Sequence, residues 1–127
     1  PYSEDWDLWL RIAREYPVIK LNKGLTLYRQ HPKQGNRLTR EIDYRTVLLR
    51  DAAEKWGLCS RDGRCISRQQ FMQNIARYQM EFGLKHLASN NLKPAMHSLW
   101  KAWLSHPANL KTLAYVPAGL LGWRPKW

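Results

Sequence analysis

The chain has 127 residues, with 21 lysines and arginines against 10 aspartates and glutamates, so its formal net charge is +11. Hydrophobic residues make up 44% of the chain and charged residues 24%, which is close to the average of globular proteins and excludes wholesale disorder. No apolar run reaches the roughly 18 residues of a membrane-spanning helix. The first residues are acidic and include no initiator methionine, so we expect no signal peptide and interpret the chain as a piece of a longer protein.

The first predicted element is a helix over residues 3–16. Ser3 is a good N-cap, and the acids that follow it face the positive end of the helix dipole. Apolar residues at helical spacing form a broad surface, so we expect this helix to be buried on most sides. These residues are Trp6, Leu8, Trp9, Leu10, Ile12, Ala13 and Tyr16. Pro17 ends the helix because the residue before a proline avoids the helical region.

A small β-hairpin is predicted next. Residues 18–21 form its first strand, and residues 22–24 form a turn in which Gly24 supplies any positive φ that is needed. Residues 25–31 alternate with a period of two, as a second strand does, before Pro32 interrupts the pattern. The helix and hairpin together are too small to fold alone, so we expect them to pack against another part of the protein.

From Leu38 onward the pattern predicts only helices. The first shows one apolar face that ends at Gly57, and Ser67 caps a second, longer helix. The expected ranges are about 38–56, 67–90, 92–105 and 108–121. We therefore predict a mainly α fold of four to five helices with one small β-hairpin.

Two cysteines, Cys59 and Cys65, flank an Asp-Gly turn. A single pair at this spacing could close a small loop, whereas two thiols alone cannot complete a zinc site. We favour two free thiols in a reducing compartment.

The charge is unevenly distributed. Residues 1–16 carry four acids against two arginines, a net charge of −2, so the remainder carries +13. This balance is compatible with nucleic acid, anionic lipid or phosphate-bearing substrates. The basic residues are scattered and no DNA- or RNA-binding motif accompanies them, so we expect no nucleic-acid partner.

The C-terminal residues combine aromatic and basic side chains, namely Trp123, Arg124, Lys126 and Trp127. One interpretation is a frayed tail with a few packed side chains. The other is a peripheral membrane anchor, with the tryptophans at headgroup depth and the two cations on anionic lipid.

Two motifs near the start occur in a specific order and spacing. The first is Ser-Glu-Asp-Trp-Asp-Leu-Trp-Leu-Arg at residues 3–11, and the second is Leu-x-Leu-Tyr-Arg-x-His at residues 25–31. Together they resemble the C-terminal end of the catalytic domain of family-2 glycosyltransferases, over residues 2–36 or about a quarter of the chain. The resemblance implies a GT-A fold and inverting transfer of a sugar from a nucleotide-sugar donor to a glycan or lipid-linked acceptor.

By this resemblance Asp5 is the catalytic base that deprotonates the acceptor hydroxyl, with Glu4 beside it. The chemistry needs such a group, since a sugar hydroxyl is a poor nucleophile until a carboxylate accepts its proton. A helix N-terminus favours the negative charge and holds it on a rigid element. The alternative is that both acids only stabilise the first helical turn.

Arg29 and His31 match the residues that the family places near the donor diphosphate and its divalent metal, Mn²⁺ or Mg²⁺. An imidazole can ligate the metal, and a guanidinium can neutralise phosphate charge. The alternative for His31 is an exposed residue at a strand end. The chain lacks both an Asp-x-Asp motif outside the first helix and the donor-binding half, so we expect these residues alone to be inactive and to bind no cofactor.

A weaker resemblance lies in the helical part. Gly83, Ala95, Ala102 and Pro107 have the spacing of the small residues and closing proline of a tetratricopeptide helix pair, although His86 stands where an aromatic is usual. Small residues at these points let two antiparallel helices approach closely. The alternative function is therefore a helical protein-interaction module.

These predictions divide the chain into two parts. Residues 1–37 are the end of a glycosyltransferase catalytic domain, and residues 38–127 are a C-terminal helical extension. We expect a cytoplasmic location, with peripheral contact at the inner face of the plasma membrane through the C-terminal tail. Because the first helix would lose its cover in the isolated piece, we also expect a homodimer of these residues.

Overall fold

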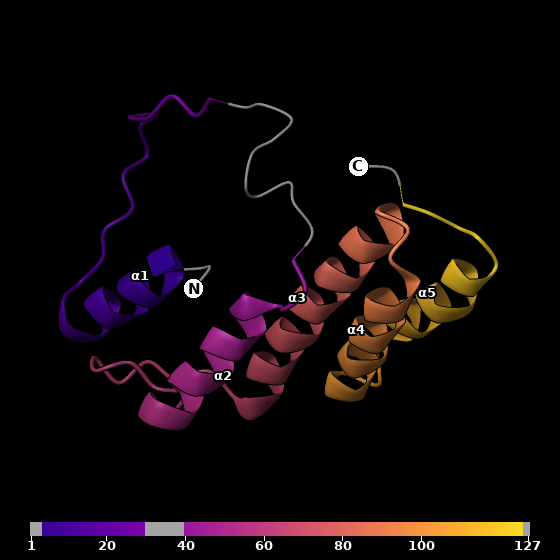
Figure 1. The fold of residues 1–127 in the computed structure, drawn as a ribbon. Coiled ribbons are helices and arrows are strands. Elements are labelled where there is room, and N and C mark those ends of the chain that lie inside the picture. Colours follow the sequence, from indigo (N-terminus) through magenta and orange to yellow (C-terminus); the bar gives the residue numbers. More distant parts are fainter. Residues whose placement is uncertain (1–3, 30–39, 126–127) are drawn as a thin grey trace.

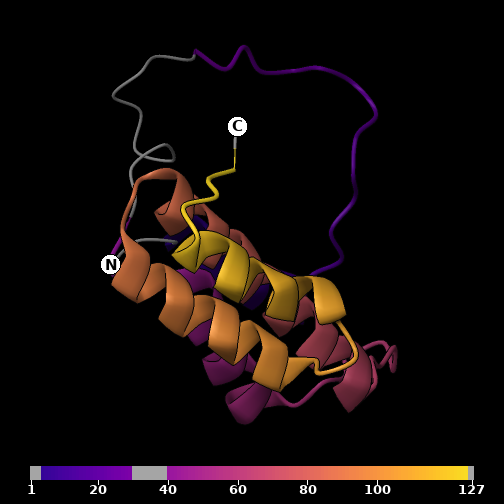
Figure 2. The same ribbon diagram turned by 90° about the vertical axis from the view of Figure 1, so that its right-hand side faces the viewer.

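The computed structural model describes residues 4–29 and 40–125, and this part of the chain forms five helices (Figure 1). They are α1 (Glu4–Glu15), α2 (Tyr44–Trp56), α3 (Arg68–Ala88), α4 (Leu92–Ser105) and α5 (Leu110–Leu120). Helices α2 to α5 follow one another as antiparallel neighbours, and α1 lies near α2 (Figures 1 and 2). The mainly helical fold class is thus confirmed.

The core lies between α3 and α4, with α5 packed on α4. Its fully buried side chains are Ile75, Leu87, Ala95, Leu99 and Ala102. Met80, Met96, Tyr115 and Val116 are partly buried against it. The stability of this fold therefore depends mainly on residues 68–120.

Glycines set the distance between these helices. A Cβ atom on Gly83 would lie 2.8 Å from Leu99 Cγ and 3.1 Å from the carbonyl oxygen of Ala95. A Cβ atom on Gly119 of α5 would lie 2.8 Å from a methyl carbon of Leu87. The two distances of 2.8 Å are too short for a real contact of a Cβ atom, so these helices approach as closely as they do because glycine has no side chain. This is the close approach that the spacing of small residues predicts.

Helix α3 begins at a complete capping box. The Ser67 hydroxyl accepts a hydrogen bond from the Gln70 N–H at 3.1 Å, and the Gln70 side chain accepts one from the Ser67 N–H at 2.9 Å. The predicted cap at Ser67 is confirmed. Near the end of α3, His86 is buried against Phe82, and its Nε2 donates to the carbonyl oxygen of Arg40 at 2.8 Å. This contact ties the residues before α2 to the core.

Helix α2 begins later than predicted, at Tyr44 rather than near residue 38. Asp43 is its N-cap and accepts a hydrogen bond from the Thr46 N–H at 3.4 Å. Burial raises the pKa of this carboxyl, while its hydrogen bonds to Thr46 act in the opposite direction. The Asp43 cap explains why α2 begins at Tyr44, since its carboxylate accepts a hydrogen bond from a backbone N–H of the first turn that has no partner within the helix.

The predicted hairpin is not shown. Residues 18–29 contain no strand and arch away from the helices (Figures 1 and 2), and residues 30 and 31 of the second strand lie outside the described residues. A two-stranded hairpin is marginal unless a third strand or a helix covers it. Here no described element lies against it.

The expected burial of α1 is wrong. None of its residues is buried, and Leu8, Trp9 and Tyr16 are 48%, 58% and 69% exposed. The reason is that α2, α3 and the loop after α2 touch only part of its apolar surface. In the described ranges, no helix has both the length and the apolar character needed to cross a membrane.

The expectation of two free thiols is also wrong, because Cys59 and Cys65 form a disulfide. The Ser60 N–H donates to the Arg64 carbonyl at 2.8 Å, and the Ile66 N–H donates to that of Leu58 at 3.0 Å. These bonds pair the two sides of the loop and bring the cysteines opposite each other, with their Cα atoms 4.1 Å apart. We call residues 59–65 the disulfide loop.

Candidate functional site

The two acids proposed as the catalytic pair, Glu4 and Asp5, share the first turn of α1, and both are exposed. Asp5 Oδ1 accepts a hydrogen bond from the Trp6 N–H at 2.9 Å. Asp7, in the same turn, instead forms an ion pair with Arg11 at 2.6 Å. Asp5 is thus available to an external hydroxyl, whereas Asp7 is engaged within its own helix.

The residue next to Asp5 fixes the start of α1 on the helical part. Trp6 packs its edge against Tyr78 of α3, with the ring centroids 5.8 Å apart and the planes at 84°. The guanidinium of Arg45 lies 4.8 Å from the Tyr78 ring and forms an ion pair with Glu81 at 3.3 Å. An edge-to-face aromatic pair supported by a cation–π contact is a specific contact, so α3 positions the turn that carries Asp5.

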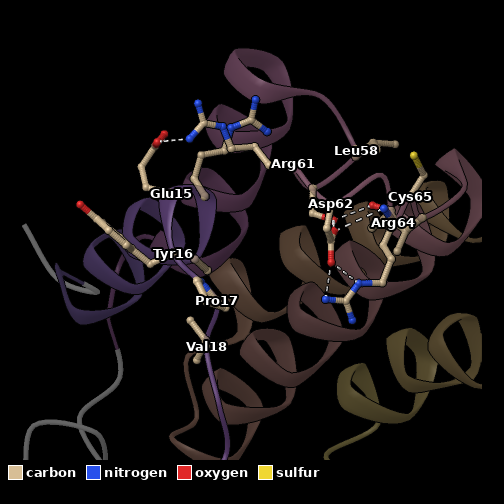
Figure 3. Close-up of a pocket in the computed structure, with 13 residues that line it drawn as sticks. Glu15, Tyr16, Pro17, Val18, Leu58, Arg61, Asp62, Arg64 and Cys65 are labelled. Atoms are coloured by element: carbon tan, nitrogen blue, oxygen red, sulfur yellow. Dashed lines mark hydrogen bonds and ion pairs between the residues drawn. The ribbon is translucent and has the colours of Figure 1, made fainter.

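The other end of α1 is held by the disulfide loop (Figure 3). Arg14 donates a hydrogen bond to the carbonyl oxygen of Cys59 at 3.2 Å, and Arg61 of the loop forms an ion pair with Glu15. Both ion-pair partners are more than half exposed, so this pair adds little stability by itself. Its effect is to fix where the helix ends.

An open cleft of about 680 Å³ lies between the end of α1 and the disulfide loop (Figure 3). Apolar lining comes from Tyr16, Pro17, Val18, Leu58 and Ile66. Its charged residues are largely paired with one another, Arg61 with Glu15 and Arg64 with Asp62. The cleft is therefore a packing gap with satisfied charges and offers no obvious acid–base pair.

Asp62 has the clearest electrostatic shift in the described residues. Hydrogen bonds from the side chains of Arg64 and Ser60 lower its pKa to about 2. The side chain is exposed, and its partners belong to the same small loop. The shift therefore reflects the local structure of the loop and does not indicate a catalytic carboxyl.

The cleft and the acids are far apart. Ten residues separate Asp5 from Glu15, which is about 15 Å along the helix axis at 1.5 Å per residue. The cleft thus lies at the opposite end of α1 from the candidate base.

The structure brings together Glu4 and Asp5 but not the whole predicted site. Arg29 is exposed at the end of the segment 18–29, and His31 and Ser3 lie outside the described residues. Over residues 4–29 and 40–125, no group of three or more His, Cys, Asp or Glu side chains could hold a metal ion. The described residues therefore do not form a metal site of their own, and we derive no step through a metal.

Sequence reasoning missed the contacts that position α1. Trp6 belongs to the apolar surface predicted for the first helix, but a periodic pattern does not specify which helix faces meet, so it does not predict the contact with Tyr78. The contact between the disulfide loop and the C-terminal end of α1 has only a weak signal in the sequence, namely an Arg-Asp-Gly-Arg turn between two cysteines.

No family model matches the chain, and neither the curated proteins nor the solved structures include one with significant similarity to it. The resemblance to glycosyltransferases consequently rests on the two sequence motifs alone.

Proposed function

We propose that residues 1–37 are the acceptor-side end of the catalytic domain of a family-2, inverting glycosyltransferase, and that residues 38–127 are its helical extension. The two ordered motifs support this assignment. So does the position of Asp5, an exposed carboxylate on the first turn of a helix whose start is fixed by the contact between Trp6 and Tyr78.

The observation that carries the proposal is the uncovered apolar segment after α1. Six large apolar side chains between residues 18 and 28 are 60% to 102% exposed, namely Val18, Ile19, Leu21, Leu25, Leu27 and Tyr28. Proteins rarely leave so much contiguous apolar surface in water. The alternating pattern of residues 25–29 is what a strand needs to join a larger sheet, and in such a sheet the hairpin would form and be covered.

In the proposed reaction Asp5 takes the proton of the acceptor hydroxyl as its oxygen attacks the anomeric carbon of the sugar. The bond from that carbon to the diphosphate breaks on the opposite face, so the configuration inverts and the nucleoside diphosphate leaves with the electron pair. Arg29 and His31 would lie near the departing diphosphate, where a guanidinium offsets the growing negative charge. The complete enzyme would use Mn²⁺ or Mg²⁺ at this diphosphate.

The substrates follow from the same proposal. The donor is a nucleotide sugar and the acceptor a glycan or a lipid-linked sugar, as in polysaccharide biosynthesis. As part of this proposal we place the protein in the cytoplasm, at the inner face of the plasma membrane where lipid-linked acceptors are accessible.

The test is Asp5→Asn in the longer protein that the proposal requires. We expect transfer to fall by about 10²–10⁴-fold, the usual contribution of an acid–base group, with donor binding unchanged. Asp7→Asn is the matched control, because Asp7 lies in the same turn but pairs with Arg11. A rate for Asp5→Asn above about a tenth of the wild-type rate would refute the assignment of the base. Equal losses for Glu4→Gln would leave the base unassigned between the two acids.

The second candidate, a tetratricopeptide-like interaction module, is favoured by one observation, the glycine-mediated approach of α3 to α4. The two functions differ in what residues 40–127 contribute. Deletion of these residues from the longer protein should impair transfer if they position α1. If they serve only to bind a partner, transfer by the purified enzyme should be unchanged.

A further inference from the structure

The outward face of α5 is apolar from one end to the other. Its exposed residues recur at helical spacing, and three of them are leucines that are 65% to 89% exposed. We call this face the α5 stripe, which consists of Leu110, Ala114, Pro117, Leu120 and Leu121. The opposite face holds Thr112 and Gly119, both buried against the core. Helix α5 therefore packs through one face and leaves a second, apolar face exposed. The helix itself lies at the outer edge of the group of helices (Figures 1 and 2).

The charged residues in the part of the sequence that contains this stripe are all basic. Residues 82–127 contain six lysines and arginines and no aspartate or glutamate, although the chain as a whole has 10 acids. Lys93 and Lys101 on α4 and Lys111 on α5 are all exposed. Trp100, also on α4, is 48% exposed and lies next to Lys101 in the sequence. An apolar helix face, with exposed lysines and a tryptophan on the same and the neighbouring helix, has the composition of an interfacial membrane-binding surface.

We propose that the α5 stripe lies on an anionic lipid bilayer, with Lys93, Lys101 and Lys111 contacting the headgroups. The leucines would enter the boundary between headgroups and acyl chains, as the apolar faces of interfacial helices do. Helices α4 and α5 lie side by side (Figure 2), so the three lysines are carried by neighbouring helices. The proposal does not depend on the glycosyltransferase function, because none of its residues lies in residues 1–37.

Trp123 and Arg124, which follow α5, contact the helices, and the proposal therefore places the membrane contact on α5. Trp123 stacks on Tyr115 of α5, with the ring centroids 5.4 Å apart. Arg124 donates hydrogen bonds to Asn90 Oδ1 at 2.9 Å and to the Gly119 carbonyl oxygen at 3.0 Å. Trp123 and Arg124 are thus folded back on the protein, whereas Lys126 and Trp127 lie outside the described residues.

The experiment measures binding of the 127-residue chain to vesicles by co-flotation. One set of vesicles contains phosphatidylcholine alone, and the other contains equal parts of phosphatidylcholine and phosphatidylglycerol. We expect binding only to the second set and weaker binding at high salt, because salt screens exposed charges. Replacing Lys93, Lys101 and Lys111 by Gln should weaken binding roughly fivefold per lysine, about a hundredfold together.

The apolar contribution is tested by replacing Leu110, Leu120 and Leu121 with Ser, which should weaken binding by about tenfold or more. These side chains are exposed, so circular dichroism should show an unchanged fold. The matched control replaces three other exposed leucines, Leu21, Leu25 and Leu27, with Ser and should bind as the wild type does.

Three results would overturn the proposal. The first is no binding to the anionic vesicles, and the second is an equal loss in the leucine variant and its control. The third is a dimer in light scattering that the α5 leucine variant alone converts to monomers, without any vesicle binding. That last result would make the stripe an interface between copies of the chain.

Discussion

Replacing Gly83 with Ala tests whether glycine permits the α3–α4 contact. The new Cβ would lie 2.8 Å from Leu99 Cγ and 3.1 Å from the Ala95 carbonyl oxygen. Leu99 is fully buried and the carbonyl belongs to the backbone of α4, so neither can move away easily. Overpacking of this kind costs about 1–3 kcal/mol, while a Gly-to-Ala change in a helix returns about 1 kcal/mol. Because neither neighbour can move away, the cost should lie in the upper part of that range, about 2–3 kcal/mol, which leaves a net loss of about 1–2 kcal/mol in the free energy of unfolding.

The assay is urea and thermal unfolding followed by circular dichroism at 222 nm, a wavelength at which helices dominate the signal. A loss of this size should lower the melting temperature by about 4–8 °C in a domain of this size. Asn74→Ala is the control, because Asn74 lies on the exposed side of the same helix and gains helix propensity without a clash. If Gly83→Ala were as stable as the wild type, or more so, the close approach of α3 and α4 would be refuted.

Three further predictions concern the loop and the surface of α1. Replacing both Cys59 and Cys65 with Ser should cost about 2 kcal/mol of stability through the lost loop closure, and should increase tryptic cleavage at the end of α1. Because the pKa of Asp62 is lowered to about 2 from 3.8, its ionised form stabilises the fold above pH 3.8, and this contribution is lost as the pH falls toward 2. Asp62→Asn should therefore flatten the decline of the urea midpoint over that range, and an unchanged decline would contradict the shift. Trp9 is 58% exposed, so the isolated chain should form dimers that Trp9→Glu converts to monomers in light scattering; a wild-type monomer would remove that expectation.

The helices of the C-terminal part were predictable because their signals are local. Ser67 and Gln70 form a capping box within four residues, and such a signal needs no knowledge of the rest of the fold. Gly83 could be placed at a close contact because small residues spaced like Gly83, Ala95 and Ala102 let two antiparallel helices approach closely. Helix α4 accordingly has the predicted range, Leu92–Ser105.

The predictions that the structure does not bear out depend on contacts that a local sequence pattern does not specify. The strand pattern of residues 18–29 describes a surface that needs a partner, and no described element supplies one. Helix α1 has enough apolar residues to be buried, but its periodicity does not say what would cover them. The pairing of Cys59 with Cys65 depends on backbone hydrogen bonds across the loop, which composition alone does not reveal.

The candidate site was predictable from the sequence only in part. Glu4 and Asp5 could be placed on a helix start from the sequence, since acids in a first turn are a local signal. Their approach to Arg29 and His31 depends on the fold of a hairpin that the described residues do not show. The contact of Trp6 with Tyr78 links positions far apart in the chain, and only the structure reveals it.

The contacts that hold α1 also set an order of assembly during synthesis. Glu15 pairs with Arg61, which is 46 residues later in the chain. At the usual rate of synthesis, the ribosome adds those residues about 2–9 s after Glu15. During that interval the exposed aromatic residues of α1 can be covered only by a surface made earlier, such as the donor-binding half that we propose, or by a chaperone. Production of residues 1–127 alone should therefore depend more strongly on chaperone supply than production of residues 40–127, whose core contacts lie close together in sequence.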